Sequence, residues 1–360
     1  MKTSFAERRR ALQAKIAARG LAGILSTNPA DWLYLTGFTG DAGALVILRG
    51  GTALLTDGRF IAQAKEETSG IRVVKQKGSL TTSVGKLLRD RGRGKIGFVA
   101  AQVSVEQFRA LRKAAGTGIR WVAAGDGIGS LRQVKEAGEI AQMRKAALLA
   151  GEVLSSALKL LKPGVREIEI AAEIEYQMRK RGASGPAFET IVAFGVRSAH
   201  PHARPTEKRL TKNELVVLDL GAILAHYCSD ITRTVFVGRA PARIRRWYRA
   251  VQEAQEAAIA ATKAGSTCGD VDAAARGVLA RYRLDRYFVH STGHGLGLEV
   301  HEDPRVARGQ KHILVPGNVI TIEPGVYVPG VGGIRIEDDV AVHAGRTEVL
   351  TRVPRNLIEI

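Results

Sequence analysis

The stretch His290-Ser-Thr-Gly-His-Gly-Leu-Gly-Leu-Glu-Val-His-Glu-Asp-Pro304 holds three histidines, His290, His294 and His301, within twelve residues. The glycines between them permit a tight loop in which several imidazoles converge. Imidazole is the usual protein metal ligand and a proton carrier near neutral pH. A single histidine is more often a hydrogen-bonded core residue, whereas three at these spacings favour a functional cluster. All eight histidines lie at position 200 or later, so we expect such chemistry in the C-terminal part.

Two aspartates upstream interrupt runs that otherwise read as buried strands. Asp219 ends the apolar run Leu215-Val-Val-Leu218, and Asp230 precedes Ile231-Thr-Arg-Thr-Val-Phe-Val237 eleven residues later. A buried carboxylate needs a cation or strong hydrogen-bond donors. If the two strands pair, both carboxylates lie on one face, where they repel unless they share a proton or a metal. The alternative for either residue alone is a turn or strand-end aspartate bound to backbone.

Two glutamates and an arginine extend this pattern toward the C-terminus. Glu323 interrupts another strand-like run, and Arg335 and Glu337 are two residues apart, so they project from the same face of a strand. The arginine forms either a simple salt bridge or a contact that orients a metal-binding glutamate. Four carboxylates and one imidazole suit hard divalent ions, and they are too many ligands for one ordinary zinc site. They suit two metals about 3.5–4 Å apart.

Length, charge and composition set the frame around this site. The chain has 360 residues, enough for two domains. It carries 54 Lys+Arg against 35 Asp+Glu, a net charge of +19, which makes nucleic acid a partner to consider. No apolar run approaches the ~18 residues of a membrane span. Two cysteines exclude a disulfide framework and favour a reducing, cytoplasmic location.

The charge also divides the chain. Residues 1–130 hold 21 Lys+Arg and 9 Asp+Glu, whereas the remainder holds 33 and 26. Short apolar runs alternate with helical stretches in the first part, and the Gly-rich segment 123–131 reads as a linker. The second part reads as helices followed by strands, twice. We therefore expect a mixed α/β domain at 1–130 and a second, catalytic domain at 131–360.

These motifs resemble the dinuclear metallopeptidases of the pita-bread fold, which include methionine aminopeptidases, Xaa-Pro aminopeptidases and Xaa-Pro dipeptidases (prolidases). GHGLGLEVHEDP (293–304) and EPGVYVPGVGGIRIEDDV (323–340) are similar to the proline-peptidase branch. NPADWLYLTGFTG (28–40) and LLTDGRFIAQA (54–64) resemble its N-terminal domain. The resemblance covers nearly the whole chain. It implies an α/β (α+β) architecture, with a creatinase/prolidase-like domain followed by a pita-bread domain.

The resemblance also implies a role for each residue of the site. Two divalent ions, Mn²⁺ first and Co²⁺ or Zn²⁺ as alternatives, would be bound by Asp219, Asp230, His294, Glu323 and Glu337. Within this set Asp230 and Glu337 would bridge. A metal-bridging hydroxide would attack the peptide while Glu323 carries its proton to the leaving nitrogen. The segment Phe194–His202 matches the family stretch whose final histidine stabilises the reacting peptide, which selects His202 and not His200.

Further residues complete the implied site. His290 and His301 match the accessory histidines, and Arg335 and Tyr327 match positions that support the ligands or the substrate. A homodimer is implied, in which Asp41 or Arg59 of the N-terminal domain touches substrate at the partner's site. The predicted reaction is cleavage of the Xaa-Pro bond at the N-terminus of peptides.

Two other functions stay open from the sequence. The first is a strict Xaa-Pro dipeptidase, and we favour the aminopeptidase over it by a small margin. The second is an inactive pita-bread protein that binds partners through its basic patch; the intact ligand set disfavours it, as it disfavours a metal-free creatinase. Since the charge lies mostly outside the acidic site, we expect neither nucleic acid nor membrane as a partner.

Overall fold

The computed structural model describes residues 4–124 and 127–360. The chain divides into two compact units, Met1–Arg132 and Gln133–Ile360. Of the expected linker 123–131, Gly125 and Asp126 lie outside the described residues. The flanking residues form the end of a strand at Ala123 and the short helix α6 (Gly129–Arg132).

One mixed sheet organises the N-terminal unit. Its strand order is β4-β3-β2-β1-β5-β6, with β1 parallel to β5 and β5 parallel to β6, while β2 is antiparallel to β1 and β3. The apolar runs detected in the sequence become these strands because their side chains are buried on the sheet. The strands are β1 (Gly23–Ser26), β2 (Ala44–Leu48), β3 (Gly51–Thr56), β4 (Arg72–Lys75), β5 (Gly94–Phe98) and β6 (Ile119–Ala123).

Most of the longer helices of this unit begin at a residue whose side chain caps the helix. Ser79 and Ser104 each accept a backbone hydrogen bond at the start of the helix that follows, which satisfies an otherwise unpaired N–H. Leu88 and Leu111 of these two helices pack with Ile96 of the sheet in one buried cluster. The helices are α1 (Phe5–Ala18), α2 (Pro29–Thr36), α3 (Ile61–Glu67), α4 (Leu80–Arg91), η1 (Ala100–Gln102) and α5 (Val105–Ala115).

The C-terminal unit contains two main sheets that carry the candidate ligands. One has the order β20-β12-β9-β8, and the other has the order β14-β13-β15-β18-β19. Smaller sheets join β11, β10 and β7, and join β16 with β17. The strands are β7 (Gly185–Pro186), β8 (Ile191–Phe194), β9 (Glu214–Leu220), β10 (Ala222–Leu224), β11 (Tyr227–Cys228), β12 (Ile231–Val237), β13 (Gly293–Gly295), β14 (Glu302–Val306), β15 (Val319–Ile322), β16 (Gly325–Val328), β17 (Gly332–Arg335), β18 (Asp338–His343), β19 (Arg346–Val349) and β20 (Ile358–Glu359).

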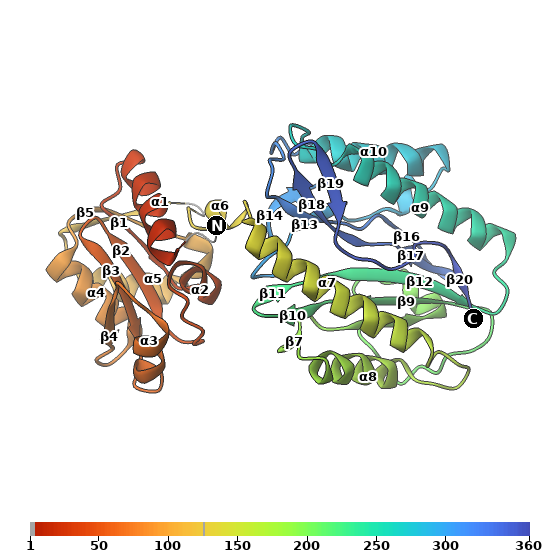
Figure 1. Ribbon diagram of the computed structural model, residues 1–360, viewed down its shortest axis with the longest axis horizontal. Helices are drawn as coiled ribbons and strands as arrows, with labels where there is room; N and C mark the ends of the chain where they lie inside the picture. Colours follow the sequence, from red (N-terminus) through yellow and green to blue (C-terminus); the bar gives the residue numbers. More distant parts are fainter. Residues whose placement is uncertain (1–3, 125–126) are drawn as a thin grey trace. The chain divides into compact units, whose positions relative to one another are not determined.

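Two helix pairs flank these strands, which matches the repeated helix-then-strand pattern of the sequence. Figure 1 shows α7 and α8 on one side of the strands and α9 and α10 on the other. The helices are α7 (Ala137–Leu158), α8 (Glu167–Lys180), α9 (Ala242–Ala261) and α10 (Cys268–Arg281), with short turns η2 (Gly195–Ala199) and η3 (Asp285–Tyr287). Among the described residues, no helix is both long and apolar enough to cross a membrane.

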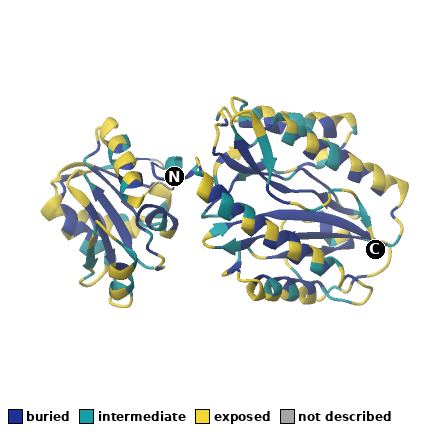
Figure 2. Cartoon of the chain, in the orientation of Figure 1, coloured by how far each residue is buried: buried dark blue, intermediate teal, exposed yellow. Residues whose placement is uncertain are grey.

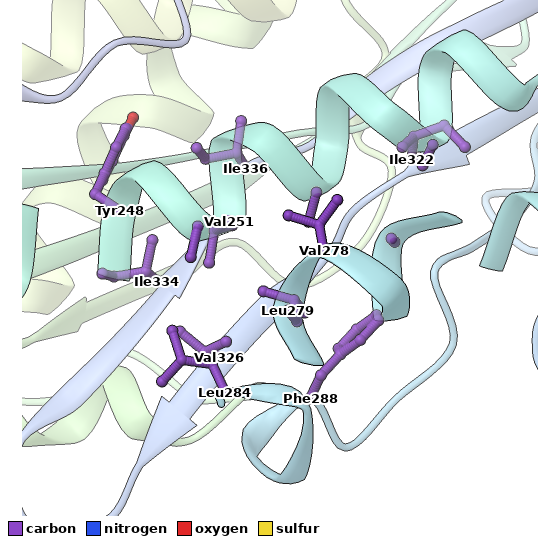
Figure 3. Close-up of a cluster of buried hydrophobic side chains, with 14 of the residues drawn as sticks. Tyr248, Val251, Val278, Leu279, Leu284, Phe288, Ile322, Val326, Ile334 and Ile336 are labelled. Atoms are coloured by element: carbon purple, nitrogen blue, oxygen red, sulfur yellow. The ribbon is translucent and has the colours of Figure 1, made fainter. Parts of the chain in front are cut away.

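The strands between the helix pairs form the buried centre of this unit. Figure 2 shows them mostly buried, while the outer faces of the helices are exposed. Figure 3 shows part of one core, in which Val278 and Leu279 of α10 belong to one buried cluster with Val326 of β16 and with Ile334 of β17, which lies beside Val251 of α9. This core supports the strands that carry Glu323 and Glu337 from behind.

Removal of a core side chain from α10 is expected to destabilise this unit. Leu279→Ala deletes a side chain that is fully buried, and such truncations cost about 2–5 kcal/mol in the free energy of unfolding. Ile168→Ala, on the exposed face of α8, serves as the control and is expected to change it by less than about 0.5 kcal/mol. Urea denaturation of both variants measures the difference; equal losses would contradict the assignment of Leu279 to the core.

Candidate metal centre

Strand pairing brings the two predicted aspartates onto one face. β9 and β12 are antiparallel, and Asp219 of β9 lies opposite Thr232 of β12. Asp230 is two residues before Thr232, so it shares the face of Asp219. Strands β10 and β11 lie between the two segments, so the connection is longer than a simple hairpin.

The other candidate ligands come from the second half of the unit. His294 lies in β13, Glu323 directly follows β15, and Glu337 follows β17. His294 Nε2 is 3.7 Å from Asp230 Oδ2 and 3.7 Å from Glu323 Oε1. Ligand atoms of Asp230, His294 and Glu337 all lie within 4.8 Å of one another, a spacing that could hold a metal ion. Four segments far apart in sequence therefore meet at one point.

Backbone contacts fix the tautomer of His294. Its Nδ1 is 3.0 Å from the carbonyl oxygen of Gly295, which can only accept, so Nδ1 carries the proton. Burial lowers the pKa of His294 to about 4, which keeps the ring neutral. The unprotonated Nε2 therefore faces Asp230 and Glu323 with a lone pair available to a metal.

The buried carboxylates repel one another, and a bound cation would offset this repulsion. Burial, followed by the charge of Glu337, raises the pKa of Asp230 well above its ordinary value. Burial likewise raises the pKa of Glu323 to about 8. Asp219 Oδ1 and Asp230 Oδ1 are buried without a hydrogen-bond partner among the described residues. Unpartnered oxygens among mutually repelling acids fit divalent metal ions of the hard class.

A chain of hydrogen bonds runs behind the ligands. Arg335 donates to Asp219 Oδ2 at 2.5 Å and to Tyr327 Oη at 2.6 Å. Tyr327 Oη is 2.8 Å from His290 Nε2, while His290 Nδ1 lies 2.8 Å from the carbonyl oxygen of Ser291. Since Nδ1–H donates to this carbonyl, Nε2 carries no proton and accepts a hydrogen bond from the Tyr327 hydroxyl. Burial lowers the pKa of His290 to about 4, so this ring is also neutral.

Arg335 therefore contacts a different carboxylate from the one nearest in sequence. Its guanidinium binds Asp219, and it also donates to Thr232 Oγ1 at 3.0 Å. Thr232 in turn donates to Glu337 Oε2 at 2.6 Å. Arg335 thus orients Asp219 directly and reaches Glu337 through the Thr232 hydroxyl, which combines the two alternatives left open by the sequence.

Glycines let the histidine strand approach its neighbours closely. A Cβ at Gly293 would collide with the carbonyl oxygen of Thr321, and one at Gly295 with that of Asp303. β13 pairs with β14 on one side and β15 on the other. The small residues on either side of His294 thus place its imidazole within reach of Glu323 at the end of β15.

A buried glutamate fixes the loop that carries His202. Glu167, fully buried at the start of α8, accepts from the backbone N–H of Phe194 at 2.9 Å and of Thr206 at 2.9 Å. It also pairs with Arg197 at 3.0 Å. The two backbone bonds lie on either side of His202, so Glu167 holds both ends of the loop 194–206.

The remaining predicted residues differ in their setting. His301 is exposed, with its ring 4.4 Å from that of His294, and His202 is exposed as well. Asp41 and Arg59 are exposed in the N-terminal unit, where Arg59 pairs with Asp57 at 2.8 Å. Their predicted contact with substrate stays a prediction.

Sequence reasoning missed several residues that support the site. Thr232 could have been detected from the sequence, because Asp230, Thr232 and Thr234 are spaced two apart and so project from one face of a strand. Asp339 is buried and accepts from the Asp230 N–H at 3.1 Å. Glu167 has no such signal, since an acidic residue in the first turn of a helix is ordinary.

Comparison with known proteins adds an independent finding. Residues 141–344 match the profile of metallopeptidase family M24, and residues 8–134 match the creatinase/prolidase N-terminal domain. Xaa-Pro dipeptidase of Pyrococcus furiosus is 37% identical over 93% of this chain and 94% of its own length. The structure of an Xaa-Pro dipeptidase from Bacillus anthracis has a TM-score of 0.95 and 37% identity, covering 99% of this chain and 100% of that one. The structure of an X-Pro aminopeptidase from Thermotoga maritima has a TM-score of 0.87 and 35% identity, covering 98% and 100%.

These matches confirm the predicted resemblance, the mixed α/β architecture with its N-terminal creatinase-like and C-terminal pita-bread domains, and the prediction of an enzyme. The matched family profile covers more than half of the chain. The chain belongs to metallopeptidase family M24.

Proposed function

We propose that this chain is a metal-dependent hydrolase of Xaa-Pro peptide bonds. The observation that carries the proposal is the convergence of Asp230, His294 and Glu337 within 4.8 Å, with the unprotonated His294 Nε2 directed at the acids. Relatives that share nearly the full length are named Xaa-Pro dipeptidase and X-Pro aminopeptidase. The proline nitrogen in such a bond lacks an N–H, and its rigid ring restricts the backbone.

Of the two activities, the dipeptidase is the first candidate. Curated relatives from two Pyrococcus species carry that name, as does the Bacillus anthracis structure. The aminopeptidase that we favoured from the sequence alone is the second candidate, supported by the Thermotoga maritima structure. The two differ in whether proline must be the C-terminal residue of the substrate, as in a dipeptide, or can be followed by further residues.

Asp219, Asp230, His294, Glu323 and Glu337 would hold two divalent ions. When bound, these ions supply Lewis-acid polarisation of the scissile carbonyl and acidify water. Glu323 accepts the proton from the attacking water at its carboxylate and passes it to the proline nitrogen as the bond breaks.

The surrounding residues position the substrate. His202 and His301 are exposed beside the buried ligands, where their imidazoles can donate to the carbonyl oxygen as it gains negative charge. Tyr327 hydrogen-bonds His290 Nε2, and Arg335 orients Asp219 by a hydrogen bond. His290 Nδ1, 3.9 Å from Glu323 Oε2, borders the proton-carrying carboxyl.

A pair of substrates separates the two activities. The purified protein with Mn²⁺ is assayed on the dipeptide Ala-Pro and the tripeptide Ala-Pro-Ala, with Ala-Ala as a control without proline. A dipeptidase cleaves the first at least tenfold faster, in kcat/KM, than the second. The reverse ratio identifies an aminopeptidase. Cleavage of neither Xaa-Pro peptide with any of Mn²⁺, Co²⁺ and Zn²⁺ would overturn the proposal.

Glu167→Gln is expected to impair the loop that carries His202. The amide keeps the shape of the side chain but turns one acceptor into a donor that faces the N–H groups it should bind, a change that costs about 1–3 kcal/mol. We expect kcat/KM for the cleaved peptide to fall about tenfold. Glu169→Gln, at an exposed position two residues along the same helix, is the matched control. Unchanged kinetics in both variants would show that the loop does not need this anchor.

Mn²⁺ as the physiological metal and the homodimer also remain proposals. Assay after reconstitution with each metal tests the first, and light scattering of the purified protein tests the second.

If the homodimer forms, Asp41→Ala is expected to raise KM without lowering kcat. An unchanged KM would remove Asp41 from the substrate site.

A further inference from the structure

One edge of the N-terminal sheet gathers an unusual number of exposed cations. The edge is defined by the starts of β1, β5 and β6, and we call it the amino edge. Backbone hydrogen bonds connect its parts: Arg49 N–H donates to Ala22 O at 3.3 Å, and Ala22 N–H donates to Lys95 O at 2.8 Å. Gly94 N–H donates to Gly118 O at 3.4 Å. The exposed basic residues here are Arg19, Arg49, Arg89, Arg91, Arg93, Lys95, Arg112, Lys113 and Arg120.

These cations have almost no acidic neighbours along the chain. Among segments 19–23, 48–51, 86–95 and 109–120, all of which the structure describes, Asp90 is the single carboxylate. It pairs with Arg89 at 3.3 Å, and both side chains are more than half exposed. Within the described part of the chain, no ion pair involves Arg91, Arg93 or Lys95. Asp41, Asp57 and Glu106 lie at the opposite end of the sheet, where β2 and α5 begin and β3 ends. The unit is therefore polarised along its strands.

Helix electrostatics explain only part of this arrangement. Basic side chains in the last turn of a helix interact favourably with its dipole, which accounts for Arg89, Arg91 and Arg112. Arg93 and Lys95 lie after α4 and in β5, and Arg49 lies in the β2–β3 turn, where no helix ends. Placing like charges side by side on a surface costs free energy unless a partner of opposite charge offsets it.

The chemistry of the edge favours a phosphodiester backbone over other anionic partners. The large exposed hydrophobic residues described in this unit are Phe5 and Val105, and neither lies on the amino edge, so no side chain there inserts into lipid. The run Arg91-Gly-Arg-Gly-Lys95 spaces its cations regularly and keeps the chain between them free of side chains. Lys and Arg contacts to phosphates supply most of sequence-independent nucleic-acid binding.

We propose that the amino edge of the N-terminal unit binds the phosphate backbone of nucleic acid without sequence specificity. This reverses the expectation from the sequence that nucleic acid is not a partner. The sequence located the charge in the first 130 residues but not on one edge of their sheet. The edge is separate from the candidate metal centre, whose residues all lie in the C-terminal unit. The proposal therefore does not depend on the peptidase activity.

The test uses the full-length protein and a fluorescently labelled 20-nucleotide DNA, single-stranded and duplex, in anisotropy titrations from 50 to 300 mM KCl. The edge variant is Arg91→Glu/Arg93→Glu/Lys95→Glu. The control variant Lys65→Glu/Lys75→Glu/Lys77→Glu changes the net charge equally, at exposed positions on α3 and at or after the end of β4, away from the amino edge. Circular dichroism and thermal unfolding of both variants report that they are folded.

We expect the edge variant to bind at least tenfold more weakly at 100 mM KCl, and the control less than threefold. Each lost phosphate contact lowers the slope of log K against log salt by about 0.9, so the edge variant should lose up to about 2.7 in slope. Equal losses in the two variants would overturn the proposal, since net charge alone would then explain binding. It would also be overturned if the DNA did not bind at 50 mM KCl, or if poly-glutamate or anionic vesicles competed as strongly as unlabelled DNA.

Discussion

Glu323→Gln is expected to lower kcat for the Xaa-Pro peptide by about 10²–10⁴-fold at saturating Mn²⁺. The amide has nearly the same volume but cannot accept the proton of the attacking water or deliver it to the proline nitrogen, and such a proton transfer contributes a factor of this size. Glu323 is well suited to this role because its side chain keeps 17% exposure beside buried ligands, so water reaches it. The measurement is steady-state kinetics over a range of Mn²⁺ concentrations.

The matched control for this variant is Glu256→Gln, at an exposed position on α9. It removes the same charge, and we expect its kcat to stay within twofold of the unaltered protein. Metal content of both variants, measured by elemental analysis, separates a lost ligand from a lost proton carrier. A kcat for Glu323→Gln within tenfold of the parent would assign the proton transfer to another group.

In the protein without bound metals, the free energy of unfolding is expected to fall as pH rises from about 6.5 to 8. Glu323 has a folded pKa of about 8 against an ordinary value of 4.5, so the folded state binds more protons than the unfolded state in this range. Stability therefore falls with rising pH. Asp230 and Glu337, whose pKa values burial also raises, act in the same direction. Below pH 6.5 the lowered pKa values of His290 and His294 act in the opposite direction, so the effect is clearest above it.

Thermal unfolding of the chelated protein, with and without added Mn²⁺, measures this effect. At pH 8 the ions replace protons as partners of the carboxylates, and saturating Mn²⁺ should raise Tm by about 5–10 °C. At pH 6.5 the rise should be smaller, because protons compete for the same oxygens. His294→Ala should lose most of the rise. A chelated protein equally stable at both pH values would contradict the picture of an ion-stabilised acidic cluster.

The sequence predicted the centre of this molecule better than its surroundings. Asp219 and Asp230 were detectable because a carboxylate in an apolar strand is costly without a partner, and strand alternation fixes the face on which each lies. The family resemblance then implied one site for residues over a hundred positions apart. The structure brings Asp230, His294 and Glu337 together, and the roles of individual residues stay predictions.

What the sequence did not predict depends on contacts between distant segments. No local pattern links Glu167 to the backbone of Thr206, or Arg335 to Asp219 rather than to Glu337, because these contacts arise only when separate strands and helices pack. The positive charge is a similar case. Composition located it in the first 130 residues, but only the order of strands places Arg49 and Lys95 on either side of Ala22 at one end of the sheet.

The two glycines beside His294 also limit how this enzyme can vary. Because any side chain at Gly293 or Gly295 would overlap a neighbouring main chain, these positions are closed to substitution without a shift of β14 or β15. Laboratory evolution of substrate preference would therefore gain little by randomising them. Val196, within the loop that carries His202, and Val289, next to His290, are both exposed, so new side chains at these positions would extend into solvent.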